Sequence, residues 1–292
     1  MDREYLIGVE VSSSKIEAGL VDLNGKVIKK IIMPTDVKKG KNKVCENIIF
    51  AIEKISKDKI LGIGIGMPGP VDSKRGIIIN PNFPGWKNVL LKKIVEDKLN
   101  IRVAVENSAN CFTIAEYKCG FGKKISNMVG VLANEAIGGG IMIAGKIYRG
   151  VADNAGEIGH MTIVDDGMKC RCGSTGCLEA YSSGYAIIDA YRKASKKTVP
   201  IEEIVNLAKK DKRAKKIIEQ AAYYFGIGLA NIANTLNPEM IVVGGTVASA
   251  KGFFEIAEKE MQKRTKVLTR KVILARACTE DSGILGASST VF

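Results

Sequence analysis

Aromatic residues, proline and histidine are scarce in this sequence. Of its 292 residues 6% are aromatic, Pro occurs 7 times and His once, while 46% are hydrophobic and 26% are charged. The Gly and Pro content excludes a collagen-like or low-complexity chain, and the apolar content excludes a disordered one. We therefore expect a globular chain of about two domains, at roughly 150 residues each.

No segment is suited to cross a membrane or to direct secretion. The longest stretch without a charged residue runs from Gln220 to Pro238, but it contains Asn231, Asn234 and Asn237, which are costly in hydrocarbon. The N-terminus carries acids in its first four residues and leads into a strand pattern, without the apolar region of a signal peptide. We expect a cytoplasmic protein with no membrane partner.

Cysteine pairing and nucleic-acid signatures are also missing. The 7 cysteines are an odd number in a chain without a secretory signal, which argues against a disulfide framework. The formal net charge is +13, but the basic residues fall in separate segments, at 38–43, 209–216 and 259–271. No zinc-finger spacing and no run of alternating aromatic and basic residues accompanies them. We expect a solvated basic surface and no nucleic-acid partner.

A faint internal repeat organises the chain. Residues 5–30 and 127–150 share one pattern, in which an apolar strand, a tight turn, a second strand and a turn ending in Gly-Lys precede a third strand. Helix and strand alternate after each copy, as in the helices expected at 44–57 and 213–236 and the strands at 60–65 and 240–243. Two α/β lobes with a cleft between them follow from this repeat, and two unrelated hairpins are the alternative.

Two glycine-rich segments resemble nucleotide-binding loops without their context. Gly64 to Gly69 fits GxGxxG after a strand, but Pro68 and Pro70 continue it as a loop instead of a helix. Gly140 to Lys146 resembles a P-loop, yet Ile147 stands where the magnesium ligand belongs. We interpret both as turn glycines.

The only histidine stands close to a dense group of cysteines. His160 precedes Cys170, Cys172 and Cys177 in a loop rich in glycine. One imidazole and three thiolates form a closed tetrahedral set that suits a structural Zn²⁺. A core histidine beside incidental reduced thiols is the alternative.

These residues resemble the signature of the ROK family of sugar kinases and sugar-responsive repressors. The Glu-Ile-Gly-His sequence at 157–160 is followed by Cys-x-Cys-Gly-x-x-Gly-Cys-Leu-Glu at 170–179, and GIGIGMPGPVD, PNFPGWKN, VENSANCFTIAEYKCG, GVADNAGEIGHM, GIGLANIANTLNPEMIVVGG and DSGILGAS agree with it. The resemblance implies an actin-like (ribonuclease H-like) α/β sugar-kinase fold of two lobes, with a zinc loop. We expect lobes at 1–118, joined by a returning 277–292, and at 119–276, without the DNA-binding domain of the repressor branch.

The resemblance also implies a sugar site with one altered residue. Its hydroxyl-binding positions are Asn107, Glu157, His160 and Glu179, whose carboxylate, amide and imidazole groups suit adjacent hydroxyls. The family's general base is an Asp at the position of Ser108. A serine hydroxyl is no base near neutral pH, and loss of a general base costs roughly 10²- to 10⁴-fold in rate.

The phosphate-binding turns that the resemblance implies have changed as well. Family members carry Asp-x-Gly-Gly-Thr-Lys in the first turn and Gly-Thr-Gly in the second, where glycines allow backbone N–H groups to approach phosphate closely. The corresponding residues here are Glu10, Ser12, Ser13, Ser14 and Lys15, followed by Asn134, Glu135 and Ala136. Glu135 would place an anion against the phosphates.

The predicted function is therefore sugar binding with impaired phosphoryl transfer. We expect a homologue of sugar kinases that binds a hexose or N-acetylhexosamine and transfers phosphate poorly or not at all, with a structural Zn²⁺ and with Mg-ATP only if it is active. An active ATP-dependent glucokinase-like enzyme is one alternative, and a structural partner of an active paralogue is another. The resemblance further implies a homodimer or homotetramer.

Overall fold

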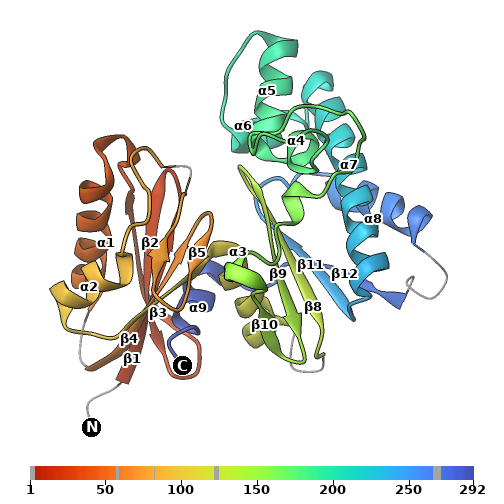
Figure 1. Ribbon diagram of the computed structural model, residues 1–292. Helices are drawn as coiled ribbons and strands as arrows, with labels where there is room; N and C mark the ends of the chain where they lie inside the picture. The colour runs from red at the N-terminus through yellow and green to blue at the C-terminus, as the bar shows by residue number, and fades with distance from the viewer. Residues whose placement is uncertain (1–3, 57–58, 82, 122–124, 266–270) are drawn as a thin grey trace. The chain divides into compact units, whose positions relative to one another are not determined.

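The chain forms two structural units with matching sheets. The computed structural model describes residues 4–56, 59–81, 83–121, 125–265 and 271–292 (Figure 1). One unit comprises Met1–Lys124, Lys146–Ala155 and Cys278–Phe292, and the other comprises Ile125–Gly145 and Gly156–Ala277. Within the described residues each of two sheets has five strands, and a small hairpin pairs β5 (Val71–Asp72) with β6 (Ile77–Ile78).

The first sheet combines an antiparallel meander with two parallel strands. The register places Leu6 opposite Val21 and Val11 opposite Ile16, which confirms the strand pairing that the repeat predicts. The expected helix at 44–57 and strand at 60–65 are also present, as α1 (Lys41–Ile55) and β4. The strand order is β3 (Val27–Pro34), β2 (Lys15–Asp22), β1 (Glu4–Val11), β4 (Lys59–Met67) and β7 (Val103–Asn107).

The two faces of this sheet are covered by different helices. Ile7 and Val9 of β1 belong to a core with α1 and α2 (Leu91–Leu99). Leu6 instead packs with residues of α3 (Ser108–Ala115) and α9 (Ser282–Ser288). The alternation follows from the two-residue period of a strand, so that Glu10 shares its face with Leu6. The C-terminal segment therefore returns to the first sheet.

The glycines of the GxGxxG segment have a packing role that the sequence analysis missed. Gly64 lies inside β4, and a Cβ there would collide with the Ala287 carbonyl of α9. Gly8 on β1 is likewise closed off by the Ile284 carbonyl. Only Gly69 stands in a turn, with φ +80°. The prediction of turn glycines is therefore wrong for Gly64 and Gly66, which lie in β4, and for Gly140, which lies in β9 (Ile137–Ile143). At Gly64 the reason is that helix α9 approaches the strand too closely for any side chain.

The second sheet repeats the strand order of the first. The repeat predicted from the sequence is thereby confirmed, with a tight turn between β8 (Met128–Ala133) and β9 (Ile137–Ile143). Only residues 134–136 separate the two strands. The order is β10 (Lys146–Tyr148), β9 (Ile137–Ile143), β8 (Met128–Ala133), β11 (Met240–Gly244) and β12 (Ile273–Arg276).

Helices of the second unit form one core with its sheet. Phe225 of α7 and Phe253 of α8 pack with ring centroids 5.2 Å apart, among residues of β8 and β11. The expected helix at 213–236 and strand at 240–243 are confirmed by α7 and β11. None of the helices in the described residues is long and apolar enough to span a membrane. The helices are α4 (Glu179–Ser182), α5 (Gly184–Ser195), α6 (Ile201–Leu207), α7 (Lys212–Leu236) and α8 (Phe253–Arg264).

Candidate functional site

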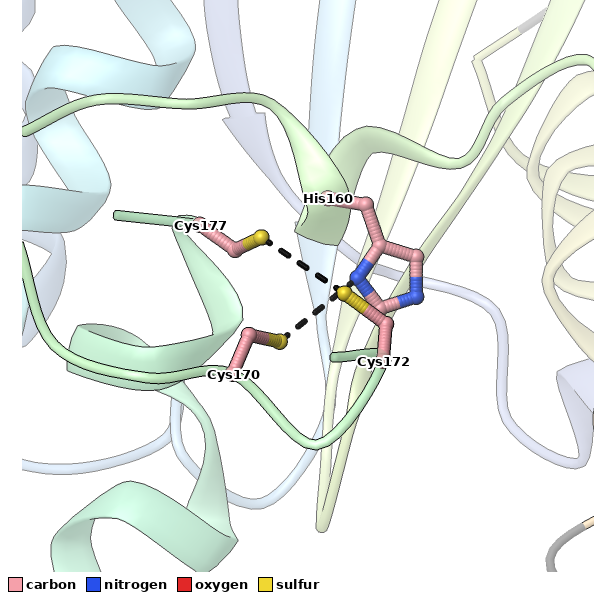
Figure 2. A group of neighbouring side chains, drawn as sticks. All are labelled: His160, Cys170, Cys172 and Cys177. Atoms are coloured by element: carbon pink, nitrogen blue, oxygen red, sulfur yellow. Dashed lines mark hydrogen bonds between the residues drawn. The ribbon is translucent and has the colours of Figure 1, made fainter. Parts of the chain in front are cut away.

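One histidine and three cysteines converge in the second unit, as the sequence predicts (Figure 2). The ligand atoms of His160, Cys170, Cys172 and Cys177 all lie within 4.8 Å of one another. The Sγ atoms of Cys172 and Cys177 are 3.8 Å apart, and the Cys170 Sγ is 3.9 Å from the His160 Nδ1. Zn–S bonds of about 2.3 Å give tetrahedron edges of about 3.8 Å, so the donor set fits Zn²⁺ in both chemistry and spacing.

Burial raises the pKa of two of these thiols, so it favours their protonated form. It raises the pKa of Cys170 to about 12 and raises that of Cys177, whereas the Ser174 backbone N–H lowers the pKa of Cys172. A thiolate is the form that binds a metal. A cation at this cluster would therefore displace protons from groups that otherwise keep them.

His160 presents its two ring nitrogens to different partners. It ends a 3₁₀ turn at Ile158–His160, with Nδ1 directed to Cys170 and Nε2 3.7 Å from a carboxylate oxygen of Glu157. A metal bound at Nδ1 leaves Nε2 for Glu157 or for a ligand hydroxyl. The two roles that the sequence predicts for His160 are therefore compatible.

Glu179 connects the cysteine loop to β9. It begins α4 and is buried, and its Oε2 accepts a hydrogen bond of 3.1 Å from the Ile137 N–H. Its other carboxylate oxygen has no hydrogen bond among the described residues. That oxygen could accept a hydrogen bond from a ligand hydroxyl.

The side-chain amide of Asn107, in the first unit, makes hydrogen bonds to backbone groups of its own unit. It caps α3, and its Oδ1 accepts from the N–H groups of Ala109 and Asn110 at 2.8 and 3.3 Å. Its Nδ2 donates to the Gly69 carbonyl at 2.9 Å, which leaves one amide hydrogen for a ligand. The neighbouring Ser108 Oγ is buried and has no hydrogen-bond partner in the part of the chain that the structure describes.

A buried acid beside Asn107 escaped the sequence analysis. Glu106 is 2% exposed, and its Oε2 accepts from the Nε and an Nη of Arg149 at 3.0 and 2.7 Å. Its Oε1 accepts from the Asn107 N–H and from the Asn110 amide. A Val-Glu-Asn sequence at a strand end gives no sign of this burial, and the arginine lies 43 residues further along the chain.

The turn at 12–15, predicted from the family resemblance to face phosphate, is closed by hydrogen bonds of its own Ser12. The Ser12 Oγ accepts from the Lys15 N–H at 3.1 Å and from the Ser14 N–H at 3.4 Å, and it donates to the Lys15 carbonyl. Backbone N–H groups of a turn are the donors that a phosphate would need. In this turn a hydroxyl occupies two of them.

Glu10 has an altered charge as well as an altered length. Burial, assisted by the facing Glu17 carboxylate, raises the pKa of Glu10 to about 7. The two acids stand directly opposite each other on β1 and β2. Glu10 is therefore only partly ionised near neutral pH, which weakens its attraction for a divalent cation.

The second turn is held by contacts within its unit. The Asn134 Oδ1 accepts from the Thr246 N–H at 2.8 Å, and the Glu135 carboxylate accepts from the Tyr185 hydroxyl at 3.1 Å. Arg171, which lies between Cys170 and Cys172 in the sequence, stacks over the Tyr185 ring with its guanidinium carbon 3.6 Å from the ring centroid. The turn is thus fixed by side chains that the Gly-Thr-Gly sequence lacks.

Comparison with known proteins assigns the chain. The sequence pattern of the ROK family matches residues 6–291. The chain belongs to the ROK family. A glucokinase of Halalkalibacterium halodurans is 33% identical over 272 residues, covering 86% of this chain and 82% of that protein. A xylose repressor of Bacillus spizizenii is also 33% identical, over 83% of this chain and 64% of the repressor.

Solved structures agree with this assignment. A ROK glucokinase from Streptomyces griseus, crystallised with glucose and AMPPNP, aligns with a TM-score of 0.87 at 28% identity over 98% of each chain. The actin-like ATPase α/β fold that the sequence predicts is therefore confirmed. The family contains both sugar kinases and repressors, so membership alone leaves the activity of this chain open.

The site residues that the sequence predicts belong to different units. Asn107, Ser108, Glu10 and the turn at 12–15 belong to the first unit. Glu157, His160, Glu179, the turn at 134–136 and the three clustered cysteines belong to the second. Within the second unit the structure brings Glu157 to His160 and joins Glu179 to β9.

Proposed function

We propose that this ROK protein binds a hexose or N-acetylhexosamine through Asn107, Glu157, His160 and Glu179, and transfers phosphate slowly or not at all. The observation that carries the proposal is the first turn, where the Ser12 hydroxyl engages the backbone N–H groups of Ser14 and Lys15. Phosphoryl transfer depends on positioned donors and cations around the phosphates. A turn that binds itself offers few of them.

The sugar side of the site retains its chemistry. Four groups can pair with hydroxyls: the His160 Nε2, one oxygen of Glu179, the Glu157 carboxylate and one amide hydrogen of Asn107. Glucose in the Streptomyces griseus structure supports a sugar as the ligand class. Damage confined to phosphate-handling positions is what selective loss of one reaction step would produce.

An active glucokinase-like enzyme is the second candidate. The 33% identity to the Halalkalibacterium halodurans glucokinase favours it. Glu10, whose pKa is about 7, or a rearranged carboxylate would then have to act in place of the missing base. Turnover decides between the two candidates.

A coupled ADP-release assay over a panel of hexoses tests the proposal. We expect wild-type turnover far below about one per second. A rate of about one per second is already at the low end of the range for ordinary enzymes. Ser108→Asp alone should not restore activity, because a base helps only when the γ-phosphate is held in line. Restoration should need Ser108→Asp together with glycines at 12 and 13 and Gly-Thr-Gly at 134–136. Wild-type turnover near one per second or faster would overturn the proposal.

We further propose that the His160 and cysteine cluster holds a structural Zn²⁺. Four protein ligands leave no open position, so the ion would order the loop at 160–177 without taking part in chemistry. A Cys₃His site requires reduced thiols, which is compatible with the cytoplasmic location that the sequence suggests. A homodimer or homotetramer remains part of the proposal on family resemblance.

A further inference from the structure

Arg149 pairs with the buried carboxylate of Glu106 next to Asn107. Glu106 is 2% exposed, whereas the Arg149 side chain is 38% exposed and reaches the carboxylate from the surface. Both residues belong to the first unit. A buried carboxylate without a partner is strongly unfavourable, and Arg149 supplies the partner for Glu106.

The Glu106 carboxylate holds the junction between β7 and α3. Its Oε1 accepts from the Asn107 N–H at 2.9 Å and from the Asn110 Nδ2 at 3.0 Å. The Asn110 N–H in turn donates to the Asn107 Oδ1. Glu106 therefore fixes Asn107 both directly and through Asn110.

The segment that carries Arg149 is itself held in a strained conformation. Ala152 and Asp153 have φ values of 54° and 58°, in the left-handed region that side chains other than glycine rarely adopt. The Asp153 Oδ2 accepts from both the N–H and the hydroxyl of Ser73, at 2.7 and 2.8 Å. Strain of this kind persists only where surrounding contacts impose it, and it gathers at functional sites. Arg149 and Asp153 are the two anchors of this segment.

We propose that Arg149 is a positioning residue for sugar binding, which acts through Glu106 to set the orientation of the Asn107 amide. This inference rests on the proposed function, because it assigns a purpose to Asn107 as a sugar ligand. With one hydrogen left for a hydroxyl, Asn107 can bind only if its amide is aimed correctly. A small rotation of the cap would turn that hydrogen away from a sugar.

Calorimetric titration of the full chain with D-glucose and N-acetyl-D-glucosamine at 25 °C tests the proposal. Arg149→Met should weaken sugar affinity about tenfold or more, and Arg149→Lys should weaken it less, because lysine keeps the charge but loses the planar fork. The neutral pair Glu106→Gln with Arg149→Met should recover affinity to within about threefold of wild type, since no uncompensated charge remains and an oxygen still faces Asn107. The control is Arg192→Met, which removes an arginine that pairs with Asp189 on an exposed surface.

A stabilising role alone would give a different result. Arg149→Met would then lower the melting temperature while sugar affinity well below that temperature stayed at the wild-type value, and the proposal would be overturned. If wild type binds neither sugar, the proposed function fails, and hydrogen exchange at residues 107–110 decides the matter. Faster exchange there in Arg149→Met, absent from Arg192→Met, would support the positioning role, and unchanged exchange would refute it.

Discussion

Glu10 shows how a single methylene and a neighbour change the chemistry of a position. It faces Glu17 across two antiparallel strands, and like charges in that arrangement repel. Burial and this repulsion raise its pKa to about 7. The sequence alone gives no sign of this shift, because it depends on burial and on the pairing of β1 with β2. Only the fold reveals that Glu10 is half-buried, with its carboxylate against Gly283 of α9.

The raised pKa makes a prediction about stability and pH. In the unfolded chain Glu10 ionises near its ordinary pKa of 4.5, and in the folded chain near 7. Between these values the folded state binds more protons, so the contribution of Glu10 to stability is present below about pH 4.5 and is lost as the pH rises to about 7. Glu10→Gln should therefore be more stable than wild type at about pH 8, by on the order of 1–3 kcal/mol, and the difference should shrink at about pH 5.

Urea denaturation of both proteins at the two pH values measures this difference. Glu53→Gln on α1 is the control, because Glu53 is exposed. It should give no comparable pH-dependent difference. If Glu10→Gln and wild type were equally stable at about pH 8, the raised pKa would be contradicted.

The loop that carries His160 and the three clustered cysteines is an element that is predictable from sequence alone. The spacing of Cys170, Cys172 and Cys177 with the only histidine was enough to predict the cluster that the structure contains. Glu106 was not predictable in the same way, because its burial depends on Arg149, which is distant in sequence. Ligands that are close in sequence can be predicted from their spacing, whereas a charge pair between distant segments is known only once the fold is known.

Removal of one ligand should expose the role of the metal in the loop. Protein purified without added metal should contain about one Zn²⁺ per chain, and Cys172→Ser should contain much less. Because a structural ion contributes directly to folding free energy, the variant should also melt at least about 5 °C lower. Cys119→Ser, at an exposed cysteine outside the cluster, is the matched control. Elemental analysis and thermal melting provide the measurements, and a metal-free wild type of full stability would disprove the site.

At the scale of the whole chain, the strand order that the two sheets share was predictable from the sequence. The packing of the C-terminal helix α9 on the first sheet was only partly predictable. Alternating strand patterns predict β1 to β3 and β8 to β10, because period-two burial is a local property. The glycines at 8 and 64 were harder to interpret, since their role is to admit α9 against the sheet. Gly64, for example, lies against Ala287 of α9, which is more than 200 residues further along the chain. The sequence near Gly64 therefore does not show why a glycine is needed there.

The two ligand classes of the family should affect this chain differently. A ligand that binds only the folded state raises stability by mass action, by about 2.7 kcal/mol at a concentration of 100 times Kd. Hydroxyls can still pair with Asn107, Glu157, His160 and Glu179. The Ser12 hydroxyl, in contrast, occupies a backbone N–H group that a phosphate would need, and the Glu135 carboxylate would repel the phosphate. A bound hexose should therefore raise the melting temperature by several degrees, and MgATP should leave it unchanged.

Thermal melting with a hexose panel, with MgATP and with both together makes the comparison. The variant with glycines at 12 and 13 and Gly-Thr-Gly at 134–136 serves as the positive control, because it should gain a response to MgATP while keeping its response to sugar. Equal stabilisation of wild type by both ligands would favour the active kinase, because it would show that the serine-lined turn still accepts phosphates. A wild type that responds to no sugar would instead favour a structural partner, since the hydroxyl-binding residues would then have no ligand to hold.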